Sequence, residues 1–237
     1  MSVRACVFDA YGTLFDVAGA ARIAAAESGG EPGAAEDAAA WADQWPRIAE
    51  DWRRKQLEYT WIRACTGAHT DFWQVTADGL DWALEAVGLQ GAPALRDRLL
   101  ALYRDLPAYP EVAATLSTLR DAGLRCAILS NGSPDMLDRA VASAGLDGAF
   151  EAVLSVEEVG VFKPDPRVYA LIERHLSLPP AQVAFVSANG WDACAAAGFG
   201  LTAIWLNRRD APLDRLHAAP AHVLPDLSPL PDLVRSL

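Results

Sequence analysis

The sequence predicts an α/β fold in which a mostly parallel sheet carries an inserted helical segment. Short apolar runs rich in β-branched or aromatic residues recur at 3–8, 125–129, 152–154, 183–186 and 201–206, and helical segments separate most of them. Strands that alternate with helices in this way favour a parallel sheet with crossover helices on both faces. A length of 237 residues fits one compact domain with an inserted subdomain better than two independent domains.

The strand pattern is absent from residue 16 to about residue 106, where the sequence is typical of helices. We therefore predict a core domain made of residues 1–15 and 107–237, and an all-helical cap subdomain made of residues 16–106. Residues 28–33 indicate a loop within the cap, and Pro46 is expected to end or kink a helix before residues 49–64. Packing within the cap and over a cleft is expected for its six tryptophans, Trp41, Trp45, Trp52, Trp61, Trp73 and Trp82.

Proline, glycine and short polar residues mark the expected helix boundaries in the second half of the chain. Pro110 is expected to open a helix that Gly123 closes. The other expected boundary residues are the N-caps Ser133 and Asp165, each followed by a proline, and the C-terminal glycines Gly145 and Gly198.

Four polar clusters follow predicted strands. In open α/β sheets ligands gather at the carboxyl ends of the strands, so these clusters are expected to converge on one site. Each cluster alone has an ordinary interpretation, such as a turn-capping carboxylate, a turn amide or a solvated lysine. Four clusters at four strand ends are hard to ascribe to chance; they consist of Asp9 with Thr13, Ser130 with Asn131, Lys163, and Ser187 with Asn189 and Asp192.

The composition restricts the partners of the chain. Its formal net charge of −11 repels nucleic acid and anionic membranes, so neither is expected as a partner. A carboxylate substrate would also be repelled, and an anion site must therefore carry its own positive charge from Lys, Arg or helix N-termini. The sequence shows neither a signal peptide nor an apolar stretch long enough to span a bilayer, which predicts a cytoplasmic protein. Free buried thiols are expected for Cys6, Cys65, Cys126 and Cys194.

These strand-end motifs resemble the haloacid dehalogenase superfamily, whose four spaced motifs match Asp9 to Thr13, Ser130, Lys163, and Asn189 to Asp192. Within the superfamily the chain is similar to the L-2-haloacid dehalogenases (type II). The strings that carry this similarity are DAYGTLFD from Asp9, WRRKQLEYTW from Trp52, LSNGS from Leu129, FKP from Phe162 and SANGWD from Ser187. The resemblance covers essentially the whole chain, and it implies a Rossmann-like core, an inserted helical cap and a homodimer.

Two positions favour a dehalogenase over the magnesium-dependent phosphatases that make up most of the superfamily. The phosphatase pattern Asp-x-Asp uses its second Asp to protonate the leaving alcohol, and here Tyr11, with an ordinary pKa of about 10, stands there. A phosphatase also needs an Asp near Ala188 to hold magnesium, and alanine offers no ligand. Halide leaves without a proton, and the single carboxylate of a haloacid can be met by backbone N–H groups and Ser130. Neither a metal nor another cofactor is therefore expected.

The resemblance implies a two-step hydrolysis of a short (S)-2-haloalkanoic acid. Asp9 attacks the halogen-bearing carbon and forms an ester, and the halide departs towards Arg53 and Asn131. Water, oriented or deprotonated by Asp192, then attacks the Asp9 carbonyl and releases the (R)-2-hydroxy acid. The other implied residues are Lys163, which would hold Asp9 ionised together with Ser187 and Asn189, the supporting Thr13 and Tyr169, and the apolar wall of Tyr11, Leu57, Phe72 and Trp191.

Three features depart from the resemblance. Cap residues 27–50 form a longer segment, Arg54 stands where Gln is common, and Ala188 replaces a frequent Ser. Other functions stay open: hydrolysis of a strained ring amino acid such as azetidine-2-carboxylate on the same fold, a magnesium phosphatase, and a catalytically idle binding module. The sequence does not determine the chain length, the halogen or the identity of the natural substrate.

Overall fold

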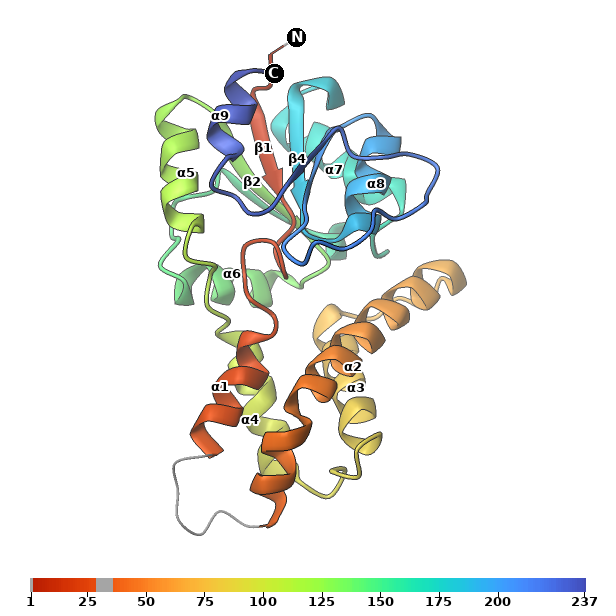
Figure 1. Cartoon of the computed structure of the whole chain (residues 1–237). Coiled ribbons are helices and arrows are strands. Elements are labelled where there is room, and N and C mark those ends of the chain that lie inside the picture. Colours follow the sequence, from red (N-terminus) through yellow and green to blue (C-terminus); the bar gives the residue numbers. More distant parts are fainter. Residues whose placement is uncertain (1, 29–35) are drawn as a thin grey trace.

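The core of the molecule is a six-stranded parallel sheet (Figure 1). The computed structural model describes residues 2–28 and 36–237. The strand order is β3-β2-β1-β4-β5-β6, and every neighbouring pair is parallel. The strands are β1 (Ala5–Phe8), β2 (Arg125–Ser130), β3 (Ala152–Ser155), β4 (Val183–Ser187), β5 (Thr202–Leu206) and β6 (His222–Leu224). The predicted fold class and the five predicted strands are confirmed.

The sixth strand was not predicted because its sequence gives almost no signal. β6 has three residues, and Val223 at its centre is exposed at the edge of the sheet. In contrast, β1 and β4 are buried throughout, since neighbouring strands and helices cover both of their faces. Continuous apolar runs of that kind allowed the central strands to be predicted from the sequence.

Helices cover both faces of the sheet. α5 packs against α9 on one side and α7 packs against α8 on the other, as Figure 1 shows. The helices of this part of the chain are α5 (Val112–Asp121), α6 (Pro134–Ser143), α7 (Pro166–Leu176), α8 (Gly190–Phe199) and α9 (Leu230–Arg235), with short 3-10 turns η1 (Val156–Glu158) and η2 (Pro180–Gln182). This arrangement leaves the carboxyl ends of the strands open to the rest of the molecule.

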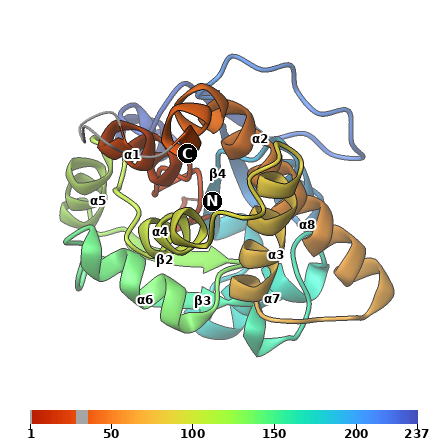
Figure 2. The same cartoon turned by 90° about the horizontal axis from the view of Figure 1, so that it is seen from below.

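Four helices lie beyond the carboxyl ends of the strands, as the two views in Figures 1 and 2 show. They are α1 (Gly19–Ser28), α2 (Glu36–Thr66), α3 (Phe72–Glu85) and α4 (Pro93–Arg104). α2 packs along α3, and α1 packs against α2 and α4. Two chain segments connect these helices to the sheet, one between β1 and α1 and one between α4 and α5. Backbone hydrogen bonds join the two segments, from Asp16 N–H to Pro107 C=O and from Tyr109 N–H to Leu14 C=O. None of the helices in the described ranges is both long and apolar enough to cross a membrane.

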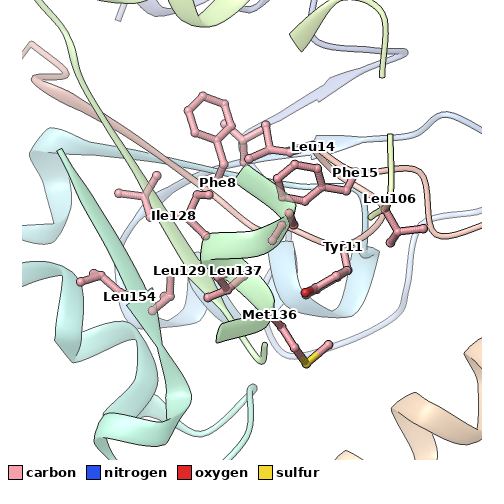
Figure 3. Close-up of a cluster of buried hydrophobic side chains, with 14 of the residues drawn as sticks. Phe8, Tyr11, Leu14, Phe15, Leu106, Ile128, Leu129, Met136, Leu137 and Leu154 are labelled. Atoms are coloured by element: carbon pink, nitrogen blue, oxygen red, sulfur yellow. The ribbon is translucent and has the colours of Figure 1, made fainter. Parts of the chain in front are cut away.

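Apolar side chains continue from the sheet into the base of these connections (Figure 3). Phe8 and Ile128 come from the sheet, Leu14 and Phe15 from the loop after β1, and Leu106 from the returning connection; all five are fully buried. Because the loop after β1 is anchored in the core on both of its sides, Asp9 and Thr13 within it are held in place.

Most expected helix boundaries are confirmed, but some are wrong. Asp165 caps α7 by accepting a hydrogen bond from Arg167 N–H, whereas Ser133 stands at the N-cap of α6 and its side chain makes no capping bond. Gly198 lies inside α8, where a Cβ would collide with the His217 ring, and the helix ends at Gly200 with a positive φ of 103°.

Expectations for the cap and the cysteines have a mixed outcome. Pro46 does not end a helix, because α2 continues through it. Cys6, Cys126 and Cys194 are buried free thiols as expected, but Cys65 is exposed near the end of α2. Of the loop expected at 28–33, Ser28 is the last residue of α1 and the rest lies outside the described residues, as does part of the lengthened segment 27–50.

Gly79 sets the closest approach of α3 to α2, which gives the first prediction. A Cβ at this position would lie 3.2 Å from Gln56 N and 3.4 Å from Trp52 C=O, both main-chain atoms that cannot move alone. Gly79→Val is expected to lower the free energy of unfolding by about 1–3 kcal/mol in urea titrations. Gly91→Val is the control, because nothing lies within 4 Å of its added Cβ. Equal stability of the two variants would contradict this account of the packing.

Candidate active site

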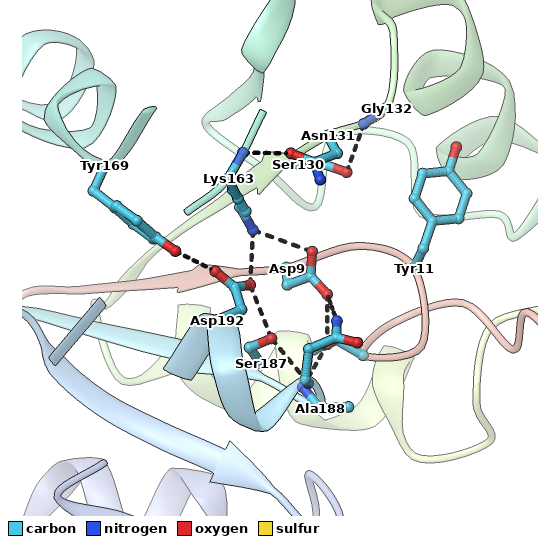
Figure 4. A network of polar contacts seen from close by, with 12 residues as sticks. Asp9, Tyr11, Ser130, Asn131, Gly132, Lys163, Tyr169, Ser187, Ala188 and Asp192 are labelled. Atoms are coloured by element: carbon cyan, nitrogen blue, oxygen red, sulfur yellow. Dashed lines mark hydrogen bonds and ion pairs between the residues drawn. The ribbon is translucent and has the colours of Figure 1, made fainter. Parts of the chain in front are cut away.

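Asp9 is the first residue after β1, and its carboxylate is the centre of a polar network (Figure 4). The residue is 6% exposed. Its Oδ1 accepts a hydrogen bond from Lys163 Nζ at 3.2 Å, and Oδ2 accepts from Thr13 Oγ1 at 3.1 Å and Asn189 Nδ2 at 2.9 Å. Donors from three separate segments therefore fix the orientation of this carboxylate.

The Thr13 hydroxyl is itself fixed. It accepts a hydrogen bond from Ala188 N–H at 2.8 Å, so its own proton points to Asp9. The tight turn that brings Thr13 back over Asp9 needs Gly12, whose φ is +88°. The loop after β1 and the loop after β4 are thus tied together at the carboxylate, as expected for neighbouring parallel strands.

Lys163 lies between two carboxylates. Its Nζ donates to Asp192 Oδ2 at 2.9 Å as well as to Asp9, and the residue is 1% exposed. Asp192 is fully buried, and it also accepts from Ser187 Oγ at 2.9 Å and from Tyr169 Oη at 2.6 Å. Lys163 does not follow a strand directly, as the sequence suggested, because η1 and a turn intervene after β3, but its ammonium still reaches the site.

Burial and charge act in opposite directions on these groups. Burial raises the pKa of Asp192 above its usual range, and the Lys163 ammonium opposes that rise. Burial alone would lower the pKa of Lys163, but the Asp192 and Asp9 carboxylates together raise it, so the ammonium stays charged. Burial, helped by Asp192, holds the pKa of Tyr169 well above its ordinary value, and Tyr169 therefore stays a neutral donor.

The loop after β2 lies beside Lys163 and does not hydrogen-bond Asp9 directly. Asn131 Oδ1 accepts from Lys163 N–H at 3.0 Å, and Ser130 Oγ accepts from Gly132 N–H at 3.1 Å. Because its oxygen is used, Asn131 has its amide NH2 left, and this group donates to none of the described residues. A Cβ on Gly132 would lie 2.8 Å from the Tyr11 ring, so this loop needs glycine to approach Tyr11.

Arg53 reaches the site from α2. Its Nη2 donates to Asn189 Oδ1 at 3.1 Å and to Tyr11 C=O at 3.3 Å, while Nη1 donates to Gln56 Oε1 at 2.7 Å. Asn189 therefore joins Arg53 to Asp9, since its oxygen accepts from the guanidinium and its NH2 donates to the carboxylate. Arg53 therefore does not form the surface ion pair that is usual for a charged residue on a helix. Its hydrogen-bond partners are Asn189, Tyr11 and Gln56.

Aromatic rings close one side of the site. Tyr11 packs on Phe72 with ring centroids 5.7 Å apart and stacks on Tyr103 at 5.6 Å. Burial raises the pKa of Tyr11 well above its ordinary value, so its phenol is no acid at neutral pH. Trp191 of α8 meets Trp61 of α2 edge to face at 5.4 Å, which joins the two parts of the molecule.

A cavity of about 700 Å³ is lined mostly by residues of α2, Arg53 among them. Leu57 lies in its wall, whereas the other three residues expected to line the apolar wall, Tyr11, Phe72 and Trp191, do not. The cavity is lined by Arg53, Leu57, Trp45, Trp61, Tyr103 and Arg209, among others.

Tyr103, Gln56 and Arg208 were not identified from the sequence as residues of the site. Gln56 contacts Arg53, and no strand-end rule points to a residue on a helix. Arg208 follows β5 and donates to Thr13 C=O at 3.0 Å, with Glu111 as its ion-pair partner at 2.7 Å. The rule that led to Asp9 and Asn189, polar residues at strand ends, would have found Arg208 after the fifth strand.

Three side chains donate hydrogen bonds to the Asp9 carboxylate: Lys163, Thr13 and Asn189. In the described ranges, no group of three or more His, Cys, Asp or Glu side chains is arranged to hold a metal ion. The position where the two carboxylates come together is filled by the Lys163 ammonium.

Comparisons with known proteins agree with this geometry. The model of the haloacid dehalogenase-like hydrolases matches residues 3–200. (S)-2-haloacid dehalogenase 1 of Pseudomonas sp. (strain CBS-3) is 42% identical over 99% of this chain and 98% of its own, and (S)-2-haloacid dehalogenase 4A of Burkholderia cepacia is 39% identical over 97% and 94%. The structure of L-2-haloacid dehalogenase from Xanthobacter autotrophicus with chloropropionic acid covalently bound superposes with a TM-score of 0.83, at 40% identity and 99% coverage of both chains.

The chain belongs to the haloacid dehalogenase-like hydrolases. Within them it falls in the L-2-haloacid dehalogenase family, which confirms the resemblance carried by the sequence motifs.

The Lys163 ion pairs give the second prediction. The raised pKa of Lys163 means that its contribution to stability is complete below its ordinary pKa of about 10.4 and is lost as pH rises through the higher folded value. Lys163→Met leaves Asp9 and Asp192 facing each other without a cation, and it is expected to cost about 3–5 kcal/mol at pH 8. The cost is expected to be smaller at pH 5, because protonation of a carboxylate relieves the repulsion.

Urea unfolding at the two pH values measures this difference. Lys55→Met is the control, since Lys55 is the only other lysine of the sequence and it pairs with Glu58 away from the site. A cost that is the same at pH 5 and pH 8 would argue against the paired carboxylates.

Proposed function

We propose that this protein is an (S)-2-haloacid dehalogenase that hydrolyses short 2-haloalkanoic acids to (R)-2-hydroxy acids. The observation that carries this proposal is the buried Asp9 carboxylate, held by three donors beside an aromatic wall, with a neutral tyrosine where a phosphatase has its acid. The names of the relatives at about 40% identity support the same activity.

The first step is displacement at saturated carbon. An Asp9 oxygen forms a bond to C2 of the substrate on the face opposite the halogen, and the carbon–halogen bond breaks with its electron pair going to the halide. The centre is inverted and an aspartyl ester remains. Tyr11 and Phe72 exclude water beside Asp9, so the carboxylate attacks without a hydration shell.

The departing halide needs a counter-charge and hydrogen-bond donors. Arg53 supplies a diffuse cation on the cap side of Asp9, and the unused NH2 group of Asn131 supplies a donor from the other side. Ser130 and nearby backbone N–H groups meet the substrate carboxylate. These roles account for the positive charge that an acidic protein must place at an anion site.

The second step regenerates the nucleophile. Water attacks the Asp9 carbonyl carbon, and one of its protons passes to Asp192. The bond between Asp9 Cγ and the alcohol oxygen then breaks, the second proton of the water goes to that oxygen, and the hydroxy acid leaves. Asp192 afterwards loses its proton to solvent. The raised pKa of Asp192 suits it as the proton acceptor. Tyr169 and Ser187 hold Asp192, while Thr13, Lys163 and Asn189 hold Asp9.

The organisation of the chain fits this chemistry. We infer that residues 1–15 and 107–237 are the catalytic core and that residues 16–106 are the cap that delivers Arg53, Leu57 and Phe72. A cytoplasmic location and a homodimer complete the proposal, together with catalysis that needs neither a metal nor another cofactor.

Halide release from separate enantiomers tests the function. With EDTA present, chloride is expected from (S)-2-chloropropionate and not from the (R) form. Asp9 attacks C2 on the face opposite the halogen, and a substrate held in one orientation presents that face in only one enantiomer. Asp9→Asn is expected to reduce release to background, which separates catalysis from binding alone. Turnover of p-nitrophenyl phosphate that is lost with chelator, or ring opening of azetidine-2-carboxylate without halide release, would favour the other hydrolases. No chloride from either enantiomer would refute the proposal.

A further inference from the structure

Gln56 is a buried amide one helical turn after Arg53 on α2. It is 1% exposed, and its Oε1 accepts from Arg53 Nη1 at 2.7 Å. Burying an amide costs free energy unless its hydrogen bonds are replaced, and an apolar residue would fill the position without that cost. The hydrogen bonds of Gln56 therefore need an explanation.

The Gln56 amide contacts two other cap helices, and one of them fixes its orientation. Thr76 of α3 donates its hydroxyl proton to Phe72 C=O at 2.7 Å, so Thr76 Oγ1 can only accept from Gln56 Nε2, also at 2.7 Å. Nε2 donates as well to Tyr103 Oη of α4 at 3.0 Å. Tyr103 Oη also lies 3.3 Å from Oε1 and can donate to it, so this hydroxyl is compatible with either orientation of the amide. Thr76 must accept from the NH2 group, and the amide oxygen therefore faces Arg53.

The chain of hydrogen bonds continues from Arg53 to the nucleophile. Nη1 of Arg53 is held by Gln56, while Nη2 contacts Asn189, which donates to Asp9. A guanidinium is planar, so fixing one nitrogen fixes the direction of the others. Gln56 thereby sets where the positive charge of Arg53 lies relative to Asp9.

A neutral acceptor suits this task better than a carboxylate. A Glu at position 56 would also hold Arg53, but it would form an ion pair that neutralises the guanidinium beside the departing anion. An amide oxygen fixes the geometry and leaves the charge available.

We propose that Gln56 is a positioning residue that aims Arg53 at the departing halide, and that it thereby contributes to the rate with poor leaving groups. This inference rests on the proposed function, since it assigns the halide to Arg53. Its effect is greatest for chloride, where more negative charge must be stabilised as the carbon–halogen bond breaks, and smaller for bromide.

The test compares substitutions that change the amide with one that does not. Gln56→Met keeps the size and removes the acceptor. Thr76→Val leaves Arg53 and Gln56 in place but removes the group that orients the amide. Thr60→Val is the matched control: both threonines are fully buried and both donate to a carbonyl of their own helix, but the Thr60 hydroxyl bonds Leu57 C=O and not the Gln56 amide.

The readouts are kcat and KM for (S)-2-chloropropionate and (S)-2-bromopropionate, and inhibition by added bromide. Gln56→Met is expected to lower kcat for the chloro substrate about 10-fold and to lower it less for the bromo substrate, with weaker bromide inhibition. Thr76→Val is expected to change these quantities in the same direction by about 3-fold. Thr60→Val is expected to match the wild type.

A loss of stability alone would lower kcat for both substrates by the same factor and leave the ratio of the two kcat values unchanged. Ratios for Gln56→Met and Thr76→Val equal to that of Thr60→Val would overturn the inference. If Gln56→Met does not fold, Thr76→Val decides by the same ratio. Wild-type protein that releases halide from neither substrate would instead refute the proposed function itself, so the two failures are distinguishable.

Discussion

The arrangement of the site depends on one buried ammonium, Lys163, between the carboxylates of Asp9 and Asp192. Two carboxylates this close in a buried environment repel each other unless a cation separates them. Lys163 lies between the two and contacts both. When Asp9 becomes an ester it loses its charge, and Lys163 is then paired with Asp192 alone. In the proposed mechanism the same ammonium thus serves the nucleophile in the first step and the base in the second.

In the proposed mechanism the sheet alone cannot complete this site, because the charge assigned to the halide comes from α2. Arg53 reaches Asp9 only through Asn189, and its direction is set by a hydrogen-bonded group inside the helical cap. Two connections, joined to each other by backbone hydrogen bonds, place that cap beyond the carboxyl ends of the strands (Figure 1). The aromatic contacts of Tyr11 and of Trp61 with Trp191 bridge the same boundary. The proposed mechanism therefore needs residues from both the sheet and these helices.

Much of the fold and of the candidate site could be predicted from the sequence. Buried parallel strands are continuous apolar runs, and the polar residues that follow their carboxyl ends lie at one edge of the sheet. That rule identified Asp9, Lys163, Asn189 and Asp192. It could not identify Gln56, whose role depends on how three helices pack, nor separate Ser130 from the direct contacts of Asp9. Local patterns also failed where tertiary packing decided the outcome: Gly198 is small because the His217 ring lies against it. Of the two outcomes expected at Pro46, an end of the helix is excluded, because α2 continues through this residue.

The central claim is that the oxygen of water enters the Asp9 carboxylate and not the substrate carbon. A single turnover with excess enzyme in water enriched in heavy oxygen tests it directly, with mass spectrometry of both the product and the peptide that contains Asp9. The account predicts that the label appears in the Asp9 side chain and that the first hydroxy acid released carries none. Label in that first product, with none in Asp9, would contradict it.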